Sequence, residues 1–175
     1  PPTPPFALVA NLPYAAATPL ISTLLLHHPE CHTFAVTIQR EVADRLLAAP
    51  GSKDYGPIAV LVSVFTRAQR LLNAPPQCFW PRPDVTSSMV LLRRRGHDDP
   101  PITRDGHGLS AFLRDLFAHR RKQLGGVLGP GVDWAAVAAS SASDGCPEIV
   151  STMRAEELTV EQIVGMGRAL GRLAE

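Results

Sequence analysis

Four consecutive residues near the start of the chain, Asn11, Leu12, Pro13 and Tyr14, combine hydrogen-bond acceptors with an aromatic ring. One chemistry open to such residues is methyl transfer to the exocyclic amine of adenine. This amine is a poor nucleophile because its lone pair is delocalised into the ring, so an enzyme must hold its hydrogens with acceptors. The Asn11 amide oxygen and the carbonyl oxygen of Leu12 or Pro13 could accept these two N–H bonds and orient the nitrogen toward a sulfonium methyl group. Tyr14 could stack on an extruded base. The alternative is an Asx turn at Asn11, a kink at Pro13 and a Tyr14 ring that only packs.

A second candidate element is the aromatic and proline-rich segment at residues 79–87. Phe79 could form the wall of a base slot opposite Tyr14, and prolines that fix φ suit a preformed slot. Two alternatives stay open for this segment. It could be a polyproline turn whose aromatic side chains fill the core, or a ligand for a proline-binding module.

The basic residues gather in one part of the chain. The net charge is only +1, yet eight of the 17 lysine and arginine residues lie between residues 93 and 122. Such a cluster can bind a polyanion, although a solvated face or cations placed at a helix end would also explain it. The candidate phosphate-binding residues are Arg93, Arg94, Arg95, Arg120, Arg121 and Lys122.

The elements that must position these residues alternate between strand and helix. The apolar segment before Asn11 is typical of a strand buried on both faces of a mostly parallel sheet, which places Asn11 at the ligand-binding carboxyl edge. Thr18 and Pro19 predict the N-cap and the first turn of the helix that follows. We therefore expect an open α/β layer with right-handed crossovers and an antiparallel end. The predicted strands are residues 6–10, 33–38, 65–72 and 85–93, and the predicted helices are residues 18–27, 40–48 and 57–64.

The composition changes after Arg95. Residues 96–101 are typical of a linker, and the remaining chain has helical periodicity with few β-branched segments. We predict helices at residues 105–119, 133–139 and 155–173. The sequence thus predicts an α/β unit at residues 1–96 and a small all-α domain at residues 97–175.

Taken together and in this order, these segments resemble the ribosomal RNA adenine dimethyltransferase family, which includes the small-subunit RNA dimethyltransferases and the erythromycin-resistance methylases. The G-S-K-D-Y-G stretch is closer to the small-subunit branch. Asp84 stands where a lysine is usual, and Trp80 is bulkier than in many members. The segments similar to family motifs are residues 11–14 (N-L-P-Y), 39–46 (Q-K-E-V-A-D-R-L), 51–56 (G-S-K-D-Y-G), 79–87 (F-x-P-x-P-x-V-x-S), 117–122 (F-x-x-R-R-K) and 154–158 (R-P-E-E-L).

The resemblance implies a fold, an activity and roles for particular residues. The fold would be the C-terminal half of a Rossmann-like methyltransferase sheet followed by a helical RNA-binding domain. The activity would be N6,N6-dimethylation, from S-adenosylmethionine, of two adjacent adenines near the 3′ end of small-subunit ribosomal RNA. The implied partners are this RNA and a pre-30S-type particle. A non-catalytic role in ribosomal RNA binding and ribosome assembly is the alternative. Asn11, Leu12, Pro13 and Tyr14 would be catalytic, Asn11 would also contact the donor, Tyr14 and Phe79 would stack on the target base, and the six basic residues would contact RNA.

The donor site of this family has a glycine-rich first turn and an acidic residue, and neither is found here. We therefore expect the first half of the family's fold to precede Pro1. We also expect this chain alone to bind the donor poorly and to be inactive. The strand at residues 6–10 would then have a bare edge, which could pair in a homodimer.

Three further classes of site or location are disfavoured. Cys31, Cys78 and Cys146 are odd in number and far apart, which favours free thiols in a reducing, cytoplasmic compartment. No apolar segment approaches the roughly 20 residues of a membrane span. We expect no metal, since His28, Cys31 and His32 lack a second pair of ligands.

Overall fold

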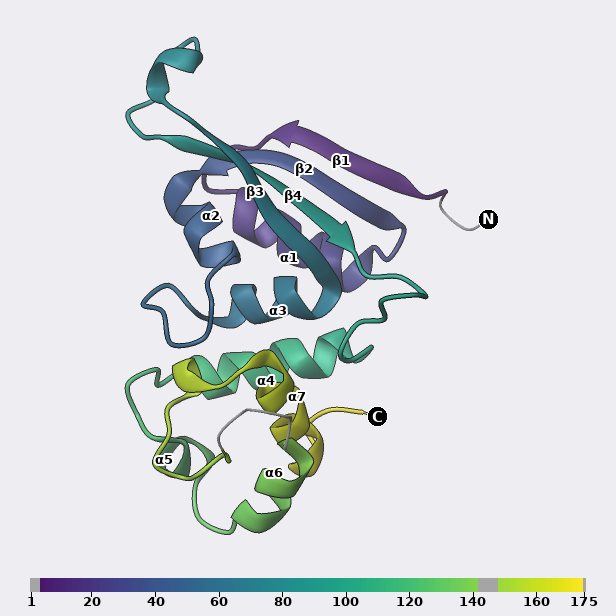
Figure 1. The fold of residues 1–175 in the computed structure, drawn as a ribbon, viewed down its shortest axis with the longest axis vertical. Coiled ribbons are helices and arrows are strands. Elements are labelled where there is room, and N and C mark those ends of the chain that lie inside the picture. Colours follow the sequence, from purple (N-terminus) through teal and green to yellow (C-terminus); the bar gives the residue numbers. More distant parts are fainter. Residues whose placement is uncertain (1–3, 142–147, 175) are drawn as a thin grey trace.

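A four-stranded sheet forms one half of the molecule (Figure 1). The computed structural model describes residues 4–141 and 148–174. The strand order is β1-β2-β4-β3; β1 pairs with β2 in parallel, and the other two pairings are antiparallel. The predicted strands and the antiparallel end are therefore confirmed. The strands are β1 (Phe6–Asn11), β2 (Cys31–Gln39), β3 (Thr66–Ala74) and β4 (Ser87–Arg94).

The strand β1 lies at the edge of this sheet and is covered on one face only. Its side chains alternate between half-buried and exposed positions, and Val9 is 77% exposed. The prediction of a strand buried on both faces is therefore wrong for the described residues, because the helices pack on one side of the sheet (Figure 1). The homodimer through this edge stays a prediction.

Three helices cover one face of the sheet: α1 (Ala17–His27), α2 (Arg40–Leu46) and α3 (Pro57–Phe65). The prediction that Thr18 caps α1 is wrong, because the helix begins at Ala17 and its N-cap residue Ala16 makes no side-chain cap bond. Instead, the backbone N–H of Ala16 donates to the carbonyl oxygen of Pro13 over 2.9 Å. The turn at Pro13 therefore leads directly into α1.

The second half of the molecule is helical, as predicted, but two of its elements differ from the prediction. The helices are α4 (Gly106–Phe117), α5 (Leu124–Leu128), α6 (Trp134–Ser141) and α7 (Val160–Ala169). The short helix α5 was not predicted because Gly125 and Gly126 are typical of a loop.

The predicted helix at residues 155–173 is wrong as one element. A 3₁₀ turn at Ala155–Glu157 precedes α7, and Thr159 caps α7. The Thr159 hydroxyl accepts from the backbone N–H of Gln162 over 3.2 Å, and the Gln162 side chain accepts from the N–H of Thr159 over 2.9 Å. This reciprocal capping box starts a new helix and interrupts the longer one.

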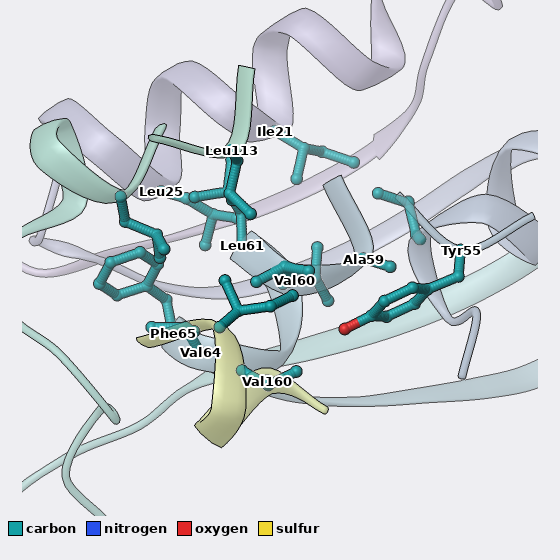
Figure 2. Close-up of a cluster of buried hydrophobic side chains, with 14 of the residues drawn as sticks. Ile21, Leu25, Tyr55, Ala59, Val60, Leu61, Val64, Phe65, Leu113 and Val160 are labelled. Atoms are coloured by element: carbon teal, nitrogen blue, oxygen red, sulfur yellow. The ribbon is translucent and has the colours of Figure 1, made fainter. Parts of the chain in front are cut away.

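A shared apolar core joins the sheet and its helices to the helical half. Figure 2 shows Phe65 of α3, Leu113 of α4 and Val160 of α7 in one buried cluster, into which the Tyr55 hydroxyl points. The division of the chain into two domains near residue 96 stays a prediction.

The helices α1 and α4 run antiparallel across this junction. The rings of His27, at the end of α1, and His107, at the start of α4, lie 4.8 Å apart. At the opposite end, Thr18 of α1 and Phe117 of α4 line a common cavity of about 480 Å³. The end of α4 therefore lies on the same side of the molecule as the start of α1. The helix α1 begins shortly after residues 11–14 in the chain.

Candidate functional site

A cavity of about 350 Å³ brings the two predicted site segments together. It lies where β1 ends and the connection between β3 and β4 folds back. Residues that are more than 60 positions apart in the chain thus share one site. The cavity is lined by Asn11, Leu12, Pro13, Tyr14, Phe79, Trp80, Pro81, Pro83 and Ser87.

The backbone holds the start of this site firmly on the sheet. Asn11 pairs with Thr37 at the end of β1, and the N–H of Leu12 donates to the Thr37 carbonyl oxygen over 3.0 Å. The Leu12 side chain is buried, with 7% exposed. Asn11 itself is exposed, and within residues 4–141 and 148–174 its amide makes no hydrogen bond. The amide is therefore available to a ligand.

The structure distinguishes the two carbonyl groups that the sequence left as alternatives. The Pro13 carbonyl oxygen already accepts from the Ala16 N–H, as described above. The Leu12 carbonyl oxygen accepts no hydrogen bond from the described part of the chain. The Asn11 amide oxygen and the Leu12 carbonyl oxygen are therefore the pair best able to hold two N–H groups.

Three aromatic side chains line the cavity at different depths. Tyr14 and Phe79 are half-buried, whereas Trp80 is 96% exposed. The peptide bond between Trp80 and Pro81 is cis. In the described residues, none of the three rings stacks on another aromatic ring. No aromatic ring of the described residues therefore occupies the faces that a planar ligand would use.

Ser87 is a cavity residue to which sequence reasoning assigned no role. It is buried at the first position of β4, and its neighbour Ser88 donates to the Asn73 amide oxygen over 2.6 Å. The N–H of Arg40 donates to the Thr86 carbonyl oxygen over 3.0 Å, which ties the start of α2 to the same segment. The place of Ser87 as the last residue of the 79–87 segment was the sequence signal that could have identified it as a cavity residue.

The Arg94 side chain is bound within the fold, and its contact with RNA stays a prediction. Its guanidinium donates to the carbonyl oxygens of Leu24 at 2.9 Å, Leu25 at 3.1 Å, His28 at 3.2 Å and Cys31 at 3.0 Å. The Leu25 carbonyl oxygen has no helical partner, because Pro29, four residues on, lacks an N–H, so Arg94 satisfies it. The carbonyl oxygens of Leu24 and His28 also accept from the backbone N–H groups of His28 and Cys31. Burial lowers the pKa of Arg94, but an arginine stays charged in a protein.

The neighbouring arginines also lie far from the cavity. Arg95 donates to the Ser63 carbonyl oxygen at 3.2 Å and to the Asp99 carboxylate at 2.6 Å. Arg93 is exposed, six residues along β4 from Ser87, which corresponds to about 20 Å. In Figure 1, β4 points to the right of the view and β1 points to the left. The loop after α4 also lies at the left.

The basic segment after α4 divides into an internal and an exposed part. The Arg120 side chain is bound within the fold, where it donates to the Glu156 carboxylate at 2.6 Å and to the Ser52 carbonyl oxygen at 3.4 Å. Arg121 and Lys122 are exposed, and their side chains make no ion pair with the described residues. Only Arg121 and Lys122 of this segment are therefore free to bind phosphate.

Asn11 offers an unpaired amide at the cavity, beside the open carbonyl of Leu12, and its contact with a methyl donor stays a prediction. The glycines at 125, 126, 129 and 131 lie in or beside α5 of the helical half and not after a strand. They therefore supply no phosphate or ribose cradle at the sheet edge.

The described ranges hold neither of two other kinds of site. Within residues 4–141 and 148–174, no helix is long and apolar enough to cross a membrane, and no three His, Cys, Asp or Glu side chains gather as metal ligands. Cys31 and Cys78 are free cysteines, and Cys146 lies outside the described residues.

Comparison with known proteins identifies the class and then the family. In fold, the chain is similar to a dimethyladenosine transferase from Plasmodium falciparum, with a TM-score of 0.76 at 20% identity over 98% of this chain and 69% of that one. It is also similar to the 23S rRNA methyltransferase ErmE, with a TM-score of 0.68 at 21% identity over 98% of this chain and 67% of that one. The chain therefore shares its fold with these two transferases.

The model of the family described as ribosomal RNA adenine dimethylase matches residues 2–169, and the chain belongs to this family. Two relatives are both named ribosomal RNA small subunit methyltransferase A. The one from Lachnoclostridium phytofermentans is 37% identical, over 90% of this chain and 54% of its own length. The one from Cutibacterium acnes is 38% identical, over 96% of this chain and 57% of its own length. The chain spans about half the length of these curated relatives.

Proposed function

We propose that this chain supplies the target-adenine site of an enzyme that dimethylates N6 of two adjacent adenines near the 3′ end of small-subunit ribosomal RNA. The observation that carries the proposal is the unpaired Asn11 amide beside the open Leu12 carbonyl, in a cavity with two half-buried aromatic rings. The names of the relatives agree with an activity on the small subunit.

The two acceptors match the hydrogens of an adenine amine. The Asn11 amide oxygen accepts one N–H, and the Leu12 carbonyl oxygen accepts the other. These bonds hold the nitrogen in place and favour the pyramidal form, in which its lone pair is free for attack. S-adenosylmethionine, when bound, supplies the electrophilic methyl group.

The aromatic rings hold the base itself. A base extruded from a stack loses its stacking energy, and Tyr14 and Phe79 offer rings at the same cavity to replace it. Stacking of this kind contributes about 1–3 kcal/mol per base. The half-buried position of both rings leaves a planar slot partly shielded from water.

Two exposed cations extend the site toward the RNA backbone. Arg121 and Lys122 follow α4 on the side of the molecule where α1 begins, so the phosphates of an RNA strand that leaves the cavity along this side can reach them. Arg93 lies at the other end of β4, and Arg94 and Arg120 are bound within the fold. We therefore assign RNA contact to Arg121 and Lys122 first.

The test is the product formed by the full-length protein with S-adenosylmethionine. Small-subunit and large-subunit ribosomal RNA are incubated separately and digested, and the fragments are measured by mass spectrometry. We expect two methyl groups on each of two adjacent adenines, in the small-subunit RNA only. Methylation confined to large-subunit RNA would contradict the substrate. Tight RNA binding without any methylation would favour the alternative role in assembly.

A further inference from the structure

Trp80 is the most exposed large apolar side chain in the described residues, and it lines the candidate site. It is 96% exposed, although it follows the half-buried Phe79 directly. An isolated exposed apolar residue is ordinary, but an aromatic ring at the rim of a ligand cavity is typical of a binding surface. The burial pattern places Phe79 deeper in the wall and Trp80 at its outer edge.

We propose that Trp80 and Arg82 form a second nucleotide subsite, which binds a single-stranded RNA nucleotide next to the target adenine. This inference rests on the proposed function, because it takes the target base to occupy the cavity between Tyr14 and Phe79. The indole of Trp80 stacks on the neighbouring base, and the guanidinium of Arg82 contacts its phosphate.

Phe79 and Trp80 are consecutive in the chain, and both line the same cavity. A nucleotide next to a base held against Phe79 can therefore reach Trp80 at the rim. Since the Trp80 ring stacks on no other aromatic ring in the described residues, its face is open to that base.

The charge beside Trp80 favours a nucleic acid over an apolar partner. Arg82 is exposed, and within the described ranges it makes no hydrogen bond or ion pair. A free guanidinium two residues along the chain from an open indole matches the phosphate and the base of one nucleotide. Asp84 is the only acidic residue of residues 75–86, and its charge opposes the phosphate.

The experiment uses the intrinsic fluorescence of the chain. It has two tryptophans, and Trp134 lies at the start of α6 in the helical half. The Trp134→Phe variant leaves Trp80 as the only reporter, and a single-stranded RNA of four adenines is the probe. We expect saturable quenching, because a stacked base changes the surroundings of the indole.

Three variants then separate stacking from exposure. Trp80→Leu should weaken binding of the four-adenine RNA about tenfold, which corresponds to about 1.4 kcal/mol. Trp80→Phe keeps a ring and should lose less affinity. Leu72→Ser is the matched control, since Leu72 is 48% exposed on β3 but does not line the cavity. The affinity of this variant for the four-adenine RNA should be unchanged.

Two outcomes would overturn the subsite: no quenching of Trp80, or equal affinity of Trp80→Leu and the unchanged protein. If methylation then still depends on Asn11, the proposed function stands and the subsite fails. If Trp80→Leu weakens RNA binding while Asn11→Ala methylates normally, the subsite stands and the proposed chemistry fails. The melting temperature of each variant shows that the fold is retained.

Discussion

The Nε atom of Arg120 donates a hydrogen bond to the Oε2 atom of Glu156 over 2.6 Å. The backbone N–H of Gly51 donates to the Glu156 carbonyl oxygen over 2.7 Å, and Gly51 has a φ of 79°. This φ favours glycine, because other residues rarely adopt it. The loop before α3, the segment after α4 and the turn before α7 therefore meet at Glu156.

Replacing Arg120 should lower the free energy of unfolding by more than it weakens the free energy of RNA binding. Arg120→Met removes the bonds to Glu156 and Ser52, and we expect the free energy of unfolding to fall by about 1–2 kcal/mol. Urea denaturation measures this change, with Arg121→Met as the control that should unfold like the unchanged chain. Equal stability of both variants would show that the bond to Glu156 contributes nothing.

The double variant Arg121→Met/Lys122→Met should show the opposite behaviour. Both side chains are exposed, so we expect no change in unfolding but weaker binding to small-subunit RNA. The dependence of log affinity on log salt should also flatten, because fewer counterions are released. Titrations at several salt concentrations measure this slope. An unchanged slope would assign both residues to a solvated surface.

Adjacent arginines in β4 should differ sharply in their effect on stability. Arg94→Met leaves the Leu25 carbonyl oxygen at the end of α1 without a partner and removes the bond to Leu24, and we expect a loss of about 2–3 kcal/mol. Arg93→Met is the matched control, because Arg93 is exposed and the change should cost little. Thermal unfolding of the two variants side by side measures the contrast. A small effect of Arg94→Met would mean that water replaces its bonds.

Asp105 should make stability depend on pH at the start of α4. Its carboxylate accepts from the N–H of Gly108 at 2.8 Å and of Ala174 at 3.0 Å, and these bonds hold the pKa of Asp105 below its ordinary value of 3.8. A lowered folded-state pKa contributes stability that is complete above 3.8 and lost as the pH falls through the lower value. Asp105→Ala should therefore cost about 1 kcal/mol near neutral pH.

The pH dependence supplies the check on this explanation. The difference in unfolding free energy between the unchanged chain and Asp105→Ala should shrink in acid, as the carboxylate of the unchanged chain becomes protonated. Urea denaturation at neutral pH and again in acid measures it. A difference that stays constant across this range would show that the charge of Asp105 is not what stabilises the helix start.

Tyr55 carries a hydroxyl that the fold does not use. It is 1% exposed, its hydroxyl has no hydrogen-bond partner among the described residues, and burial raises its pKa above the ordinary value. Tyr55→Phe keeps the ring beside Phe117 and removes an unsatisfied polar group, so we expect stability to rise by about 1 kcal/mol. Tyr14→Phe is the control, with no expected change because Tyr14 is half-buried. Destabilisation by Tyr55→Phe would reveal a partner for the hydroxyl.

The elements of the fold could be predicted where the pattern of apolar residues is local. The apolar segment before Asn11 and the β-branched segment around Val36 both form strands, as predicted. The ends of helices were harder to predict, because Thr18 resembles a cap while the turn is closed by a backbone bond from Ala16. Thr159 was the missed signal, since a threonine three residues before Gln162 is a capping-box pattern.

The two segments of the candidate site were predicted from residue types, and the structure places them around one cavity. The roles of the arginines could not be predicted, because a guanidinium that binds RNA and one that binds carbonyl groups look alike in a sequence. Arg94 and Arg120 find their partners up to 70 residues away, at positions that only the fold brings near. The choice between the carbonyls of Leu12 and Pro13 likewise needed the bond from Ala16.

The most direct test of the proposed site is the rate of methyl transfer by Asn11→Ala in the full-length protein, measured together with its affinity for RNA. We predict a rate lower by a factor of about 100 or more, since an aligned hydrogen-bond acceptor for the target amine is lost, with RNA affinity nearly unchanged. Asn73→Ala, which removes an amide outside the cavity, should retain the rate. Normal methylation by Asn11→Ala would contradict the claim that this amide holds the reacting nitrogen.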